Sequence, residues 1–280
     1  MASKTWFITG SSRGFGREWA EAALERGDRV AATARDADTL KPLTDRYGGS
    51  VLALTLDVTN REGAFGAVAH AHEHFGSLDV IVNNAGYGLF GAIEEVSEEQ
   101  ARAQIETNLF GALWVTQAAL PFLRAQGSGH IVQVSSIGGI VAFAGIGMYH
   151  ASKWGLEGFS EALALEVADF GIHVTLVEPG GFDTDWGGSS AVHAEPLEAY
   201  EQARQERVGR MAQSPKGRTE ASGPAILEVV DADPPPLRVF FGAAPFGLAK
   251  ARYAERLQTW EQWNGLALAA QGEPVQAGSA

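Results

Sequence analysis

The sequence contains no cysteine, which excludes disulfide bonds, thiolate nucleophiles and cysteine-ligated metal sites. It also lacks any apolar run long enough to cross a bilayer. Positive charge is scarce: 21 Lys and Arg residues stand against 34 Asp and Glu residues, for a formal net charge of −13. Because nucleic-acid binding needs clustered positive charge, we expect no nucleic-acid partner. Residues 1–4 lead directly into a strand pattern, so we expect no signal peptide, no membrane partner and a cytoplasmic location.

What is present has the composition of a globular α/β protein. The 280 residues suffice for one large domain, and we see neither internal repeats nor a linker that would divide them. Short β-prone runs alternate with helical patterns. The strand-like runs are residues 5–9, 29–33, 51–56, 78–82, 131–134, 172–177 and 237–241. The helical patterns are residues 17–26, 60–75, 97–123, 149–170, 197–211, 221–230 and 248–263.

A glycine-rich loop separates the first strand from the first helix. Gly10, Gly14 and Gly16 have the spacing G-x-x-x-G-x-G. Glycine allows a sharp turn and a close approach to a pyrophosphate, while the helix N-terminus offers free N–H groups and a positive dipole end. The order of strand, glycine turn and helix is the context that a dinucleotide-binding loop requires, although glycines also form plain turns.

Two arginines favour NADP(H) over NAD(H). Arg35 directly follows the second strand, where dinucleotide-binding units meet the adenosine ribose, and Arg13 lies in the glycine loop. Two guanidinium groups on one side can hold a 2′-phosphate by bidentate hydrogen bonds. Asp36 could instead neutralise Arg35 or contact a ribose, so NAD(H) stays an alternative, and both arginines could simply be solvated charges.

The helical pattern that begins at Tyr149 carries the chemistry. Tyr149 and Lys153 are four residues apart and therefore share one helix face. A nearby ammonium favours the phenolate, so we expect Lys153 to lower the pKa of Tyr149 towards the range useful for proton transfer. Ser136 lies thirteen residues earlier, at the end of a strand, where open α/β sheets bind ligands.

Several further segments bear on the site. Residues 83–86, Asn-Asn-Ala-Gly, follow the fourth strand, and Asn108 is a polar amide in an apolar helical stretch that needs a partner. The segment 179–184 marks an abrupt turn after the sixth strand. His70 and His74 share a helix face, but no further ligands accompany them and we expect no metal. The weakly patterned residues 185–224 have the character of a substrate loop, and residues 272–280 that of a disordered tail.

Taken together, these motifs resemble the short-chain dehydrogenase/reductase family over about residues 4–242. The matching elements, in the family's order, are Thr9-Gly10-x-x-x-Gly14-x-Gly16, Asn83-Asn84-Ala85-Gly86, Asn108, Ser136, Tyr149-x-x-x-Lys153 and Pro179-Gly180-x-x-x-Thr184. The resemblance implies a single doubly wound Rossmann-type domain, here residues 1–271, with a seven-stranded parallel sheet of order 3-2-1-4-5-6-7 flanked by helices. It also implies a homodimer or homotetramer, for which the helical patterns 97–123 and 149–170 are natural surfaces. Arg35 is similar to the NADP-preferring branch.

The resemblance implies a role for each matching residue. Tyr149 would exchange a proton with the substrate oxygen, with Ser136 holding that oxygen, Lys153 assisting Tyr149 and binding the nicotinamide ribose, and Asn108 anchoring a relay water. The cofactor contacts would be Gly10, Ser12, Arg13, Gly14, Phe15, Gly16, Arg35, Asp57, Val58, Asn83, Ala85, Gly86, Tyr149, Lys153, Pro179, Gly180, Phe182 and Thr184. Phe15 and Phe182 depart from the family's pattern, which has smaller or branched aliphatic residues there.

The predicted function is therefore an NADP(H)-dependent oxidoreductase that interconverts a carbonyl and a secondary alcohol of an apolar small molecule. Four aromatic residues are candidates for the apolar pocket: Phe90, Phe143, Trp154 and Trp186. One alternative is a catalytically silent NAD(P) sensor, although such relatives usually lack the tyrosine or the lysine. A serine hydrolase is a remote alternative, because no G-x-S-x-G elbow surrounds Ser135 or Ser136.

Overall fold

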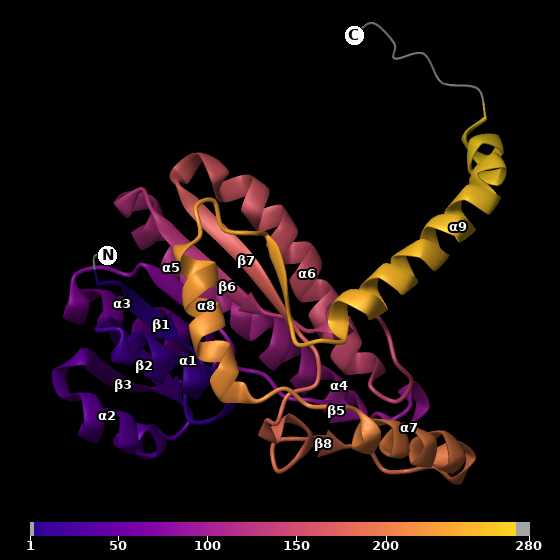
Figure 1. Ribbon diagram of the computed structural model, residues 1–280, viewed down its shortest axis with the longest axis horizontal. Coiled ribbons are helices and arrows are strands. Elements are labelled where there is room, and N and C mark those ends of the chain that lie inside the picture. The colour runs from indigo at the N-terminus through magenta and orange to yellow at the C-terminus, as the bar shows by residue number, and fades with distance from the viewer. Residues whose placement is uncertain (1–2, 273–280) are drawn as a thin grey trace, which may run out of the picture.

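The computed structural model describes residues 3–272, without the side chains of residues 210–213. A central sheet of seven parallel strands has the order β3-β2-β1-β4-β6-β7-β9 (Figure 1). These strands are β1 Thr5–Ile8, β2 Arg29–Ala34, β3 Val51–Thr55, β4 Val80–Asn83, β6 Gly129–Val134, β7 Ile172–Pro179 and β9 Arg238–Phe241. Numbered within this sheet alone, their order is the predicted 3-2-1-4-5-6-7, so the predicted fold class is confirmed.

Helices cover both faces of the sheet, which explains why its central strands are apolar throughout. All four residues of β1 and of β4 are buried, as expected for strands with helices on each side. One core layer joins the sheet to α1 (Gly14–Glu25) and α8 (Ser222–Asp231). The other joins it to α3 (Arg61–Phe75), α5 (Gly111–Gln126) and α6 (Gly147–Val167).

Local sequence signals set several helix ends. Asn60 caps α3 through a hydrogen bond from Gly63 N, and Gly76 ends that helix with a left-handed φ of 81°. Ser97 and Gln100 form a capping box at the start of α4 (Glu98–Ile105). The predicted single helix 97–123 is interrupted, because a π-helical turn, Glu106–Phe110, joins α4 to α5.

Three parts of the chain differ from the expectation. The helix α2 (Lys41–Tyr47) was not predicted, and neither was the small separate sheet in which β5 (Leu89–Phe90) pairs with β8 (Val192–His193). The predicted substrate loop contains β8 and α7 (Glu201–Gln213). The final helix α9 (Pro245–Gln271) is longer than predicted at both ends and projects from the body (Figure 1). Of the predicted tail, residues 273–280 lie outside the described part.

No helix among residues 3–272 combines the length and the apolar character needed to cross a membrane.

Candidate active site

The predicted catalytic residues gather at the carboxyl edge of the sheet. Ser136 follows the end of β6, while Tyr149 and Lys153 lie in the first two turns of α6. Gly138 N donates to the Ser136 hydroxyl oxygen over 2.9 Å, which fixes that side chain in the loop after the strand. The parallel strands therefore bring the serine, tyrosine and lysine to one place.

Tyr149 is buried, with 6% of its surface exposed. Burial raises the pKa of its phenol to about 12, and the neighbouring Ser136 hydroxyl acts in the opposite direction. This result differs from our expectation that Lys153 would bring the pKa down. Lys153 Nζ lies 6.0 Å from the centre of the tyrosine ring, and burial has the larger effect. At neutral pH the phenol therefore keeps its proton.

Lys153 is equally buried, and its ammonium donates to the carbonyl oxygen of Val134 over 2.7 Å. Burial lowers the pKa of Lys153 to about 8, whereas the carboxyl of Glu157, one turn further along α6, acts to raise it. An ammonium has three donors. Since Val134 uses one of them, two remain for groups that enter the site.

Asn108 is held beside this pair by the π-helical turn. Its side-chain amide donates to Tyr87 O over 3.0 Å and to Ser152 Oγ over 3.2 Å, and its oxygen accepts from Tyr87 N over 3.1 Å. A Cβ added to Gly86 would lie 3.0 Å from Asn108 Oδ1 and 3.8 Å from Lys153 Nζ. The Asn-Asn-Ala-Gly turn therefore lies directly against Asn108 and Lys153. Sequence reasoning missed Tyr87 and Ser152, since a π-turn leaves no clear sequence signal.

The glycine loop has the shape of a phosphate cradle. Gly10 and Gly14 have left-handed φ values of 68° and 57°, and a Cβ on Gly16 would collide with the carbonyl oxygen of Gly10. The following helix α1 has no side-chain cap and no acidic residue in its first turn. Its N-terminal N–H groups and positive dipole end therefore remain available to an anion, so the loop fits a dinucleotide pyrophosphate.

Hydrogen bonds tie this loop to the neighbouring strands. Ser11 N donates to Thr33 O of β2 over 2.8 Å, and the Asn84 side chain donates to Thr9 O over 2.8 Å. The Thr9 hydroxyl accepts from the backbone N–H groups of Asn84 and Ala85 over 2.9 and 3.0 Å. Hydrogen bonds thus join the loop after β1 to the turn after β4.

The two arginines predicted to bind a phosphate differ in their ion-pair partners. Arg13 forms an ion pair of 2.8 Å with Asp185 in the loop after β7. Arg35 is exposed, and within residues 3–272 it has no ion-pair partner. Asp36 does not neutralise it, because the Asp36 carboxylate accepts from Asp38 N over 3.0 Å and caps the turn Ala37–Leu40. Arg35 is therefore available to an anionic ligand.

Other predicted cofactor residues lie along the same edge. Asp57 accepts from the Thr59 hydroxyl over 2.7 Å, and Val58 packs against Gly111 at the start of α5. Asn83 donates to the Thr116 hydroxyl over 3.0 Å. Ser12, Ala85 and Gly180 lie in the loops that follow β1, β4 and β7, and Pro179 is the last residue of β7.

Phe15 and Phe182, the two departures from the family's pattern, pack against each other. Their ring centres are 4.9 Å apart at an interplanar angle of 67°. A Cβ on Gly217 would meet the Phe182 ring at 2.6 Å, so this glycine provides the space for the larger side chain. Thr184 lies close by, with a methyl group 3.8 Å from where a Cβ on Gly14 would be. The two bulky residues are thus accommodated together.

One of the four candidate pocket aromatics, Trp186, adjoins the tyrosine, and a second, Phe90, packs against Trp186. The ring of Trp186 lies 4.9 Å from the ring of Tyr149 and 5.0 Å from that of Phe90, edge-on in both cases. The indole N–H of Trp186 is buried and has no hydrogen-bond partner within the described residues. Phe143 and Trp154 are instead exposed on the surface of the body.

A buried acidic cluster next to the site was not predicted. The carboxyl of Glu157 accepts from the Ser135 hydroxyl and, over 3.1 Å, from Arg238 Nε. Arg238 Nε also lies 3.4 Å from Glu178, which is fully buried near the end of β7. Burial and the neighbouring Glu157 raise the pKa of Glu178 to about 8. These residues come from separate elements, and no sequence spacing indicates that they meet.

Comparisons with known proteins place these features in a family. The model of the family described as short chain dehydrogenase matches residues 4–194. Oxidoreductase BOA17 of Botryotinia fuckeliana is 44% identical over 276 residues, which cover 95% of this chain and 99% of that protein.

Solved structures agree with this match. A short-chain dehydrogenase from Streptomyces avermitilis is 37% identical with a TM-score of 0.90, covering 96% of this chain and 100% of that one. An alcohol dehydrogenase from the archaeon Thermococcus sibiricus, complexed with 5-hydroxy-NADP, is 27% identical with a TM-score of 0.71. The similarity covers 86% of this chain and 96% of that chain.

Proposed function

The chain belongs to the short-chain dehydrogenase family, and on that premise we propose that it is an NADP(H)-dependent oxidoreductase interconverting a carbonyl and a secondary alcohol. The observation that carries the proposal is the meeting of Ser136, Tyr149, Lys153 and Asn108 beside the glycine cradle, at the carboxyl edge of the sheet. The nicotinamide, when bound, supplies or accepts the hydride.

In the proposed reaction, the residues of the protein transfer a proton to or from the substrate oxygen. With a pKa of about 12, Tyr149 is protonated at neutral pH and can donate its proton to the substrate oxygen during reduction. Ser136 stands beside the phenol, where its hydroxyl can hold that oxygen in place. Lys153, with a pKa of about 8, is mostly an ammonium at neutral pH and stabilises the phenolate left behind. Asn108 positions the groups around Lys153 through Tyr87 and Ser152.

The proposed preference for NADP(H) rests mainly on Arg35, which is exposed and has no ion-pair partner within the described residues. Arg13 lies in the glycine loop, but its guanidinium is paired with Asp185, with which a 2′-phosphate would have to compete. Guanidinium groups bind phosphate oxygens by charge-assisted hydrogen bonds. Asp36, the carboxylate that could favour a free 2′-hydroxyl, is engaged in capping the next turn. The Thermococcus sibiricus relative was solved with an NADP derivative, which is consistent with this preference.

An apolar substrate fits the wall beside the tyrosine. Phe90 and Trp186 present their rings there, and the guanidinium of Arg207 lies over the Phe90 ring at 5.1 Å. The buried, unpaired indole N–H of Trp186 offers one hydrogen bond to a polar group of an incoming molecule. We therefore propose an apolar ketone whose carbonyl end meets Ser136 and Tyr149.

A turnover assay tests the proposal against the sensor alternative. Purified protein is mixed with NADPH and a panel of apolar and polar ketones, and the cofactor's near-ultraviolet absorbance is followed. We expect sustained, enzyme-dependent loss of absorbance with at least one apolar ketone. Stoichiometric NADPH binding with no turnover on any carbonyl or alcohol would instead identify a sensor.

A further inference from the structure

Two arginines on the same face of α7 differ in what they meet. Arg204 and Arg207 are three residues apart, so their side chains point to one side of the helix. Arg204 forms an ion pair of 2.9 Å with Glu95. The same carboxylate accepts from Ala92 N over 2.7 Å and from Leu197 N over 2.8 Å, so both of its oxygens are occupied. Arg207 has neither a hydrogen bond nor an ion pair with any residue in the described part of the chain.

Arg207 is held half-buried against a ring and a loop. The carbon of its guanidinium lies 5.1 Å from the centre of the Phe90 ring. A Cβ added to Gly145, in the loop before α6, would come 2.9 Å from Arg207 Nε, so this glycine leaves the space that the side chain fills. Burial lowers the pKa of Arg207, yet an arginine stays charged in proteins. A partly desolvated charge without a counterion is costly, and an anion that reached it would gain from the pairing.

A row of aromatic rings leads from this guanidinium to the proposed proton donor. The Phe90 ring lies 5.0 Å from the ring of Trp186, which lies 4.9 Å from that of Tyr149. Arg207 and the Tyr149 ring are therefore at most three steps of about 5 Å apart. The buried indole N–H of Trp186, within this row, also lacks a partner in residues 3–272. The row thus offers apolar surface and hydrogen-bond donors, and the described residues give these donors no acceptor.

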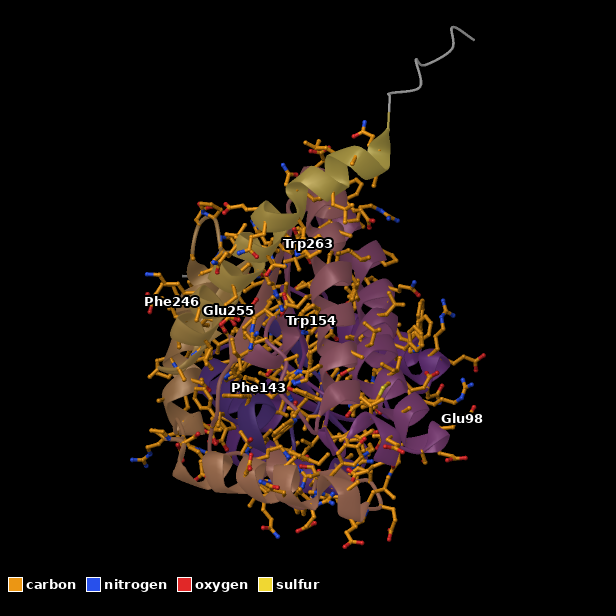
Figure 2. The ribbon with its side chains drawn as sticks, turned by 90° about the vertical axis from the view of Figure 1, so that its right-hand side faces the viewer. Glu98, Phe143, Trp154, Phe246, Glu255 and Trp263 are labelled. Atoms are coloured by element: carbon orange, nitrogen blue, oxygen red, sulfur yellow. The ribbon has the colours of Figure 1, made fainter. Side chains whose placement is uncertain are left out.

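The other two candidate pocket aromatics do not share this property. Phe143 and Trp154 are exposed on the surface below α9, where Figure 2 shows both. Arg256 lies over the Trp154 ring at 4.8 Å, but it also donates to Ile140 O over 2.8 Å. This second stacked arginine therefore already has an acceptor, whereas Arg207 has none among the described residues.

We propose that Arg207 binds a carboxylate of the substrate, which makes the substrate an oxo-acid with an apolar chain between its ketone and its carboxylate. This inference rests on the proposed function, because it concerns the substrate of the same site. The guanidinium pairs with the carboxylate through two parallel hydrogen bonds, the chain lies along the rings of the row, and the ketone reaches Tyr149. A phosphate fits less well, since it carries nearly two charges and the neighbouring Arg204 is already paired with Glu95.

Matched pairs of substrates test the proposal. NADPH-dependent reduction is measured for levulinic acid, for its longer homologues and for the methyl ester of each, which keeps the ketone and the chain but removes the charge. We expect wild-type kcat/KM to favour the acid over its ester at one or more chain lengths. Arg207→Gln should lower kcat/KM about 10–100-fold for that acid and leave its ester unchanged, because only the acid uses the charge-assisted pair. Arg207→Lys, which keeps the charge without the bidentate geometry, should fall between the two.

Arg218→Gln is the matched control, because it removes an exposed arginine from the same segment of the chain and should leave kcat/KM for acid and ester unchanged. Far-ultraviolet circular dichroism and Tm check that the variants fold. An equal loss for acid and ester in Arg207→Gln would reduce Arg207 to packing α7 against Phe90 and overturn the proposal. A wild-type protein without preference for the acids, or with faster reduction of the corresponding oxo-phosphonates, would overturn it as well.

A binding measurement separates this proposal from the proposed function. Octanoate has a carboxylate and an apolar chain but no ketone, so its binding does not depend on turnover. By isothermal titration calorimetry we expect the wild-type protein to bind octanoate and Arg207→Gln to bind it about 10–100-fold more weakly. If no ketone is reduced while this difference holds, the oxidoreductase function fails and the carboxylate site stands. Equal octanoate affinity in the two proteins would overturn the carboxylate site, whichever ketones are reduced.

Discussion

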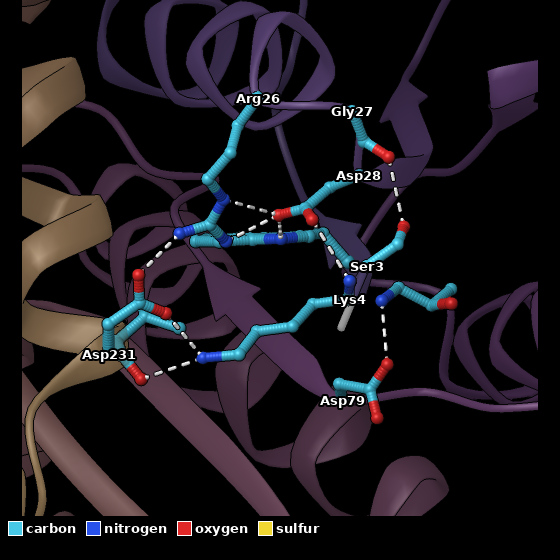
Figure 3. A network of polar contacts seen from close by, with 10 residues as sticks. Ser3, Lys4, Arg26, Gly27, Asp28, Asp79 and Asp231 are labelled. Carbon is cyan, nitrogen blue, oxygen red and sulfur yellow. Dashed lines mark hydrogen bonds and ion pairs between the residues drawn. The ribbon is translucent and has the colours of Figure 1, made fainter. Parts of the chain in front are cut away.

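The two edges of the sheet differ in whether their buried polar groups have hydrogen-bond or ion-pair partners. At the edge where the strands begin, the buried Asp28 carboxylate accepts from Lys4 N over 2.9 Å, from Trp6 Nε1 over 2.8 Å and from Arg26 (Figure 3). Asp231 then pairs with both Lys4 Nζ at 2.6 Å and Arg26 Nη1 at 2.7 Å. Each charge there meets an opposite charge or a donor, and the network joins α1 and α8 to β1.

At the edge where the strands end, buried polar atoms are left without partners. Thr33 Oγ1, Asn83 Oδ1 and Gln133 Oε1 accept no hydrogen bond from the described residues. Leaving a buried polar atom unpaired costs about 1–3 kcal/mol. A folded protein accepts that cost where ligands are to bind, so the first edge stabilises the fold and the second provides the site.

The largest effect should come from removing the proton donor at the second edge. We expect Tyr149→Phe to lower kcat by at least about 10³-fold while NADPH binding and Tm stay near wild-type values, because the phenol's proton is lost and its ring is kept. Steady-state kinetics and NADPH titration measure both. Tyr253→Phe, on α9, is the matched control and should retain activity. A Tyr149→Phe enzyme with a tenth of wild-type kcat would contradict the assignment.

Removing a charged side chain at the edge where the strands begin should lower the free energy of unfolding and leave kcat unchanged. Asp28→Ala removes the shared acceptor and leaves Arg26 and the Trp6 N–H without it, so we expect a loss of about 3–5 kcal/mol in the free energy of unfolding. Urea denaturation measures this loss, and kcat below the unfolding transition should not change. Asp45→Ala, which removes an exposed partner of Lys41, should cost less than about 1 kcal/mol. Equal losses in the two variants would refute the contrast.

At the edge where the strands end, a substitution of Arg35 should change the preference for NADPH over NADH. Arg35→Asp replaces a guanidinium with a carboxylate that repels a 2′-phosphate and can accept from a 2′-hydroxyl. We expect the ratio of kcat/KM for NADPH over NADH to fall about 10–100-fold, the value of one or two charge-assisted hydrogen bonds. Arg46→Asp, an exposed arginine on α2, is the control and should leave the ratio unchanged. An unaltered ratio in Arg35→Asp would remove Arg35 from the cofactor site.

The smallest effect concerns the buried Glu178 beside the site. Its pKa is raised from 4.5 to about 8, so between these pH values the folded protein binds a proton that the unfolded chain has lost. Wild-type stability should therefore fall as pH rises through this window. Glu178→Gln imitates the protonated acid, and we expect it to be roughly 1–3 kcal/mol more stable than wild type at pH 9 and little changed at pH 4.

Chemical denaturation at the two pH values measures this difference. Glu161→Gln, an exposed partner of the same Arg238, is the matched control and should show no comparable pH-dependent gain. An equal effect of Glu178→Gln at both pH values would mean that folding does not raise the pKa of this carboxyl.

Patterns of apolar runs, glycines and helix spacing were sufficient to predict most of the fold. The seven strands follow from local signals, their order in the sheet was implied by the family resemblance, and the four-residue spacing placed Tyr149 and Lys153 on one face of α6. What could not be predicted depends on contacts between distant segments. The π-turn that holds Asn108, the packing of Trp186 against Tyr149 and the burial that raises the tyrosine pKa arise only when separate elements meet.

The contact at Gly86 restricts how this enzyme can evolve. The turn proposed to face the nucleotide lies close to the two residues proposed to assist proton transfer, since an alanine side chain at Gly86 would come 3.0 Å from Asn108 Oδ1 and 3.8 Å from Lys153 Nζ. A substitution in this turn that shifts the bound cofactor would therefore also affect Asn108 and Lys153. Trp186 contacts the ring of Tyr149 and lies against Gly88, so a substitution there that reshapes the substrate pocket would also alter the packing of the tyrosine.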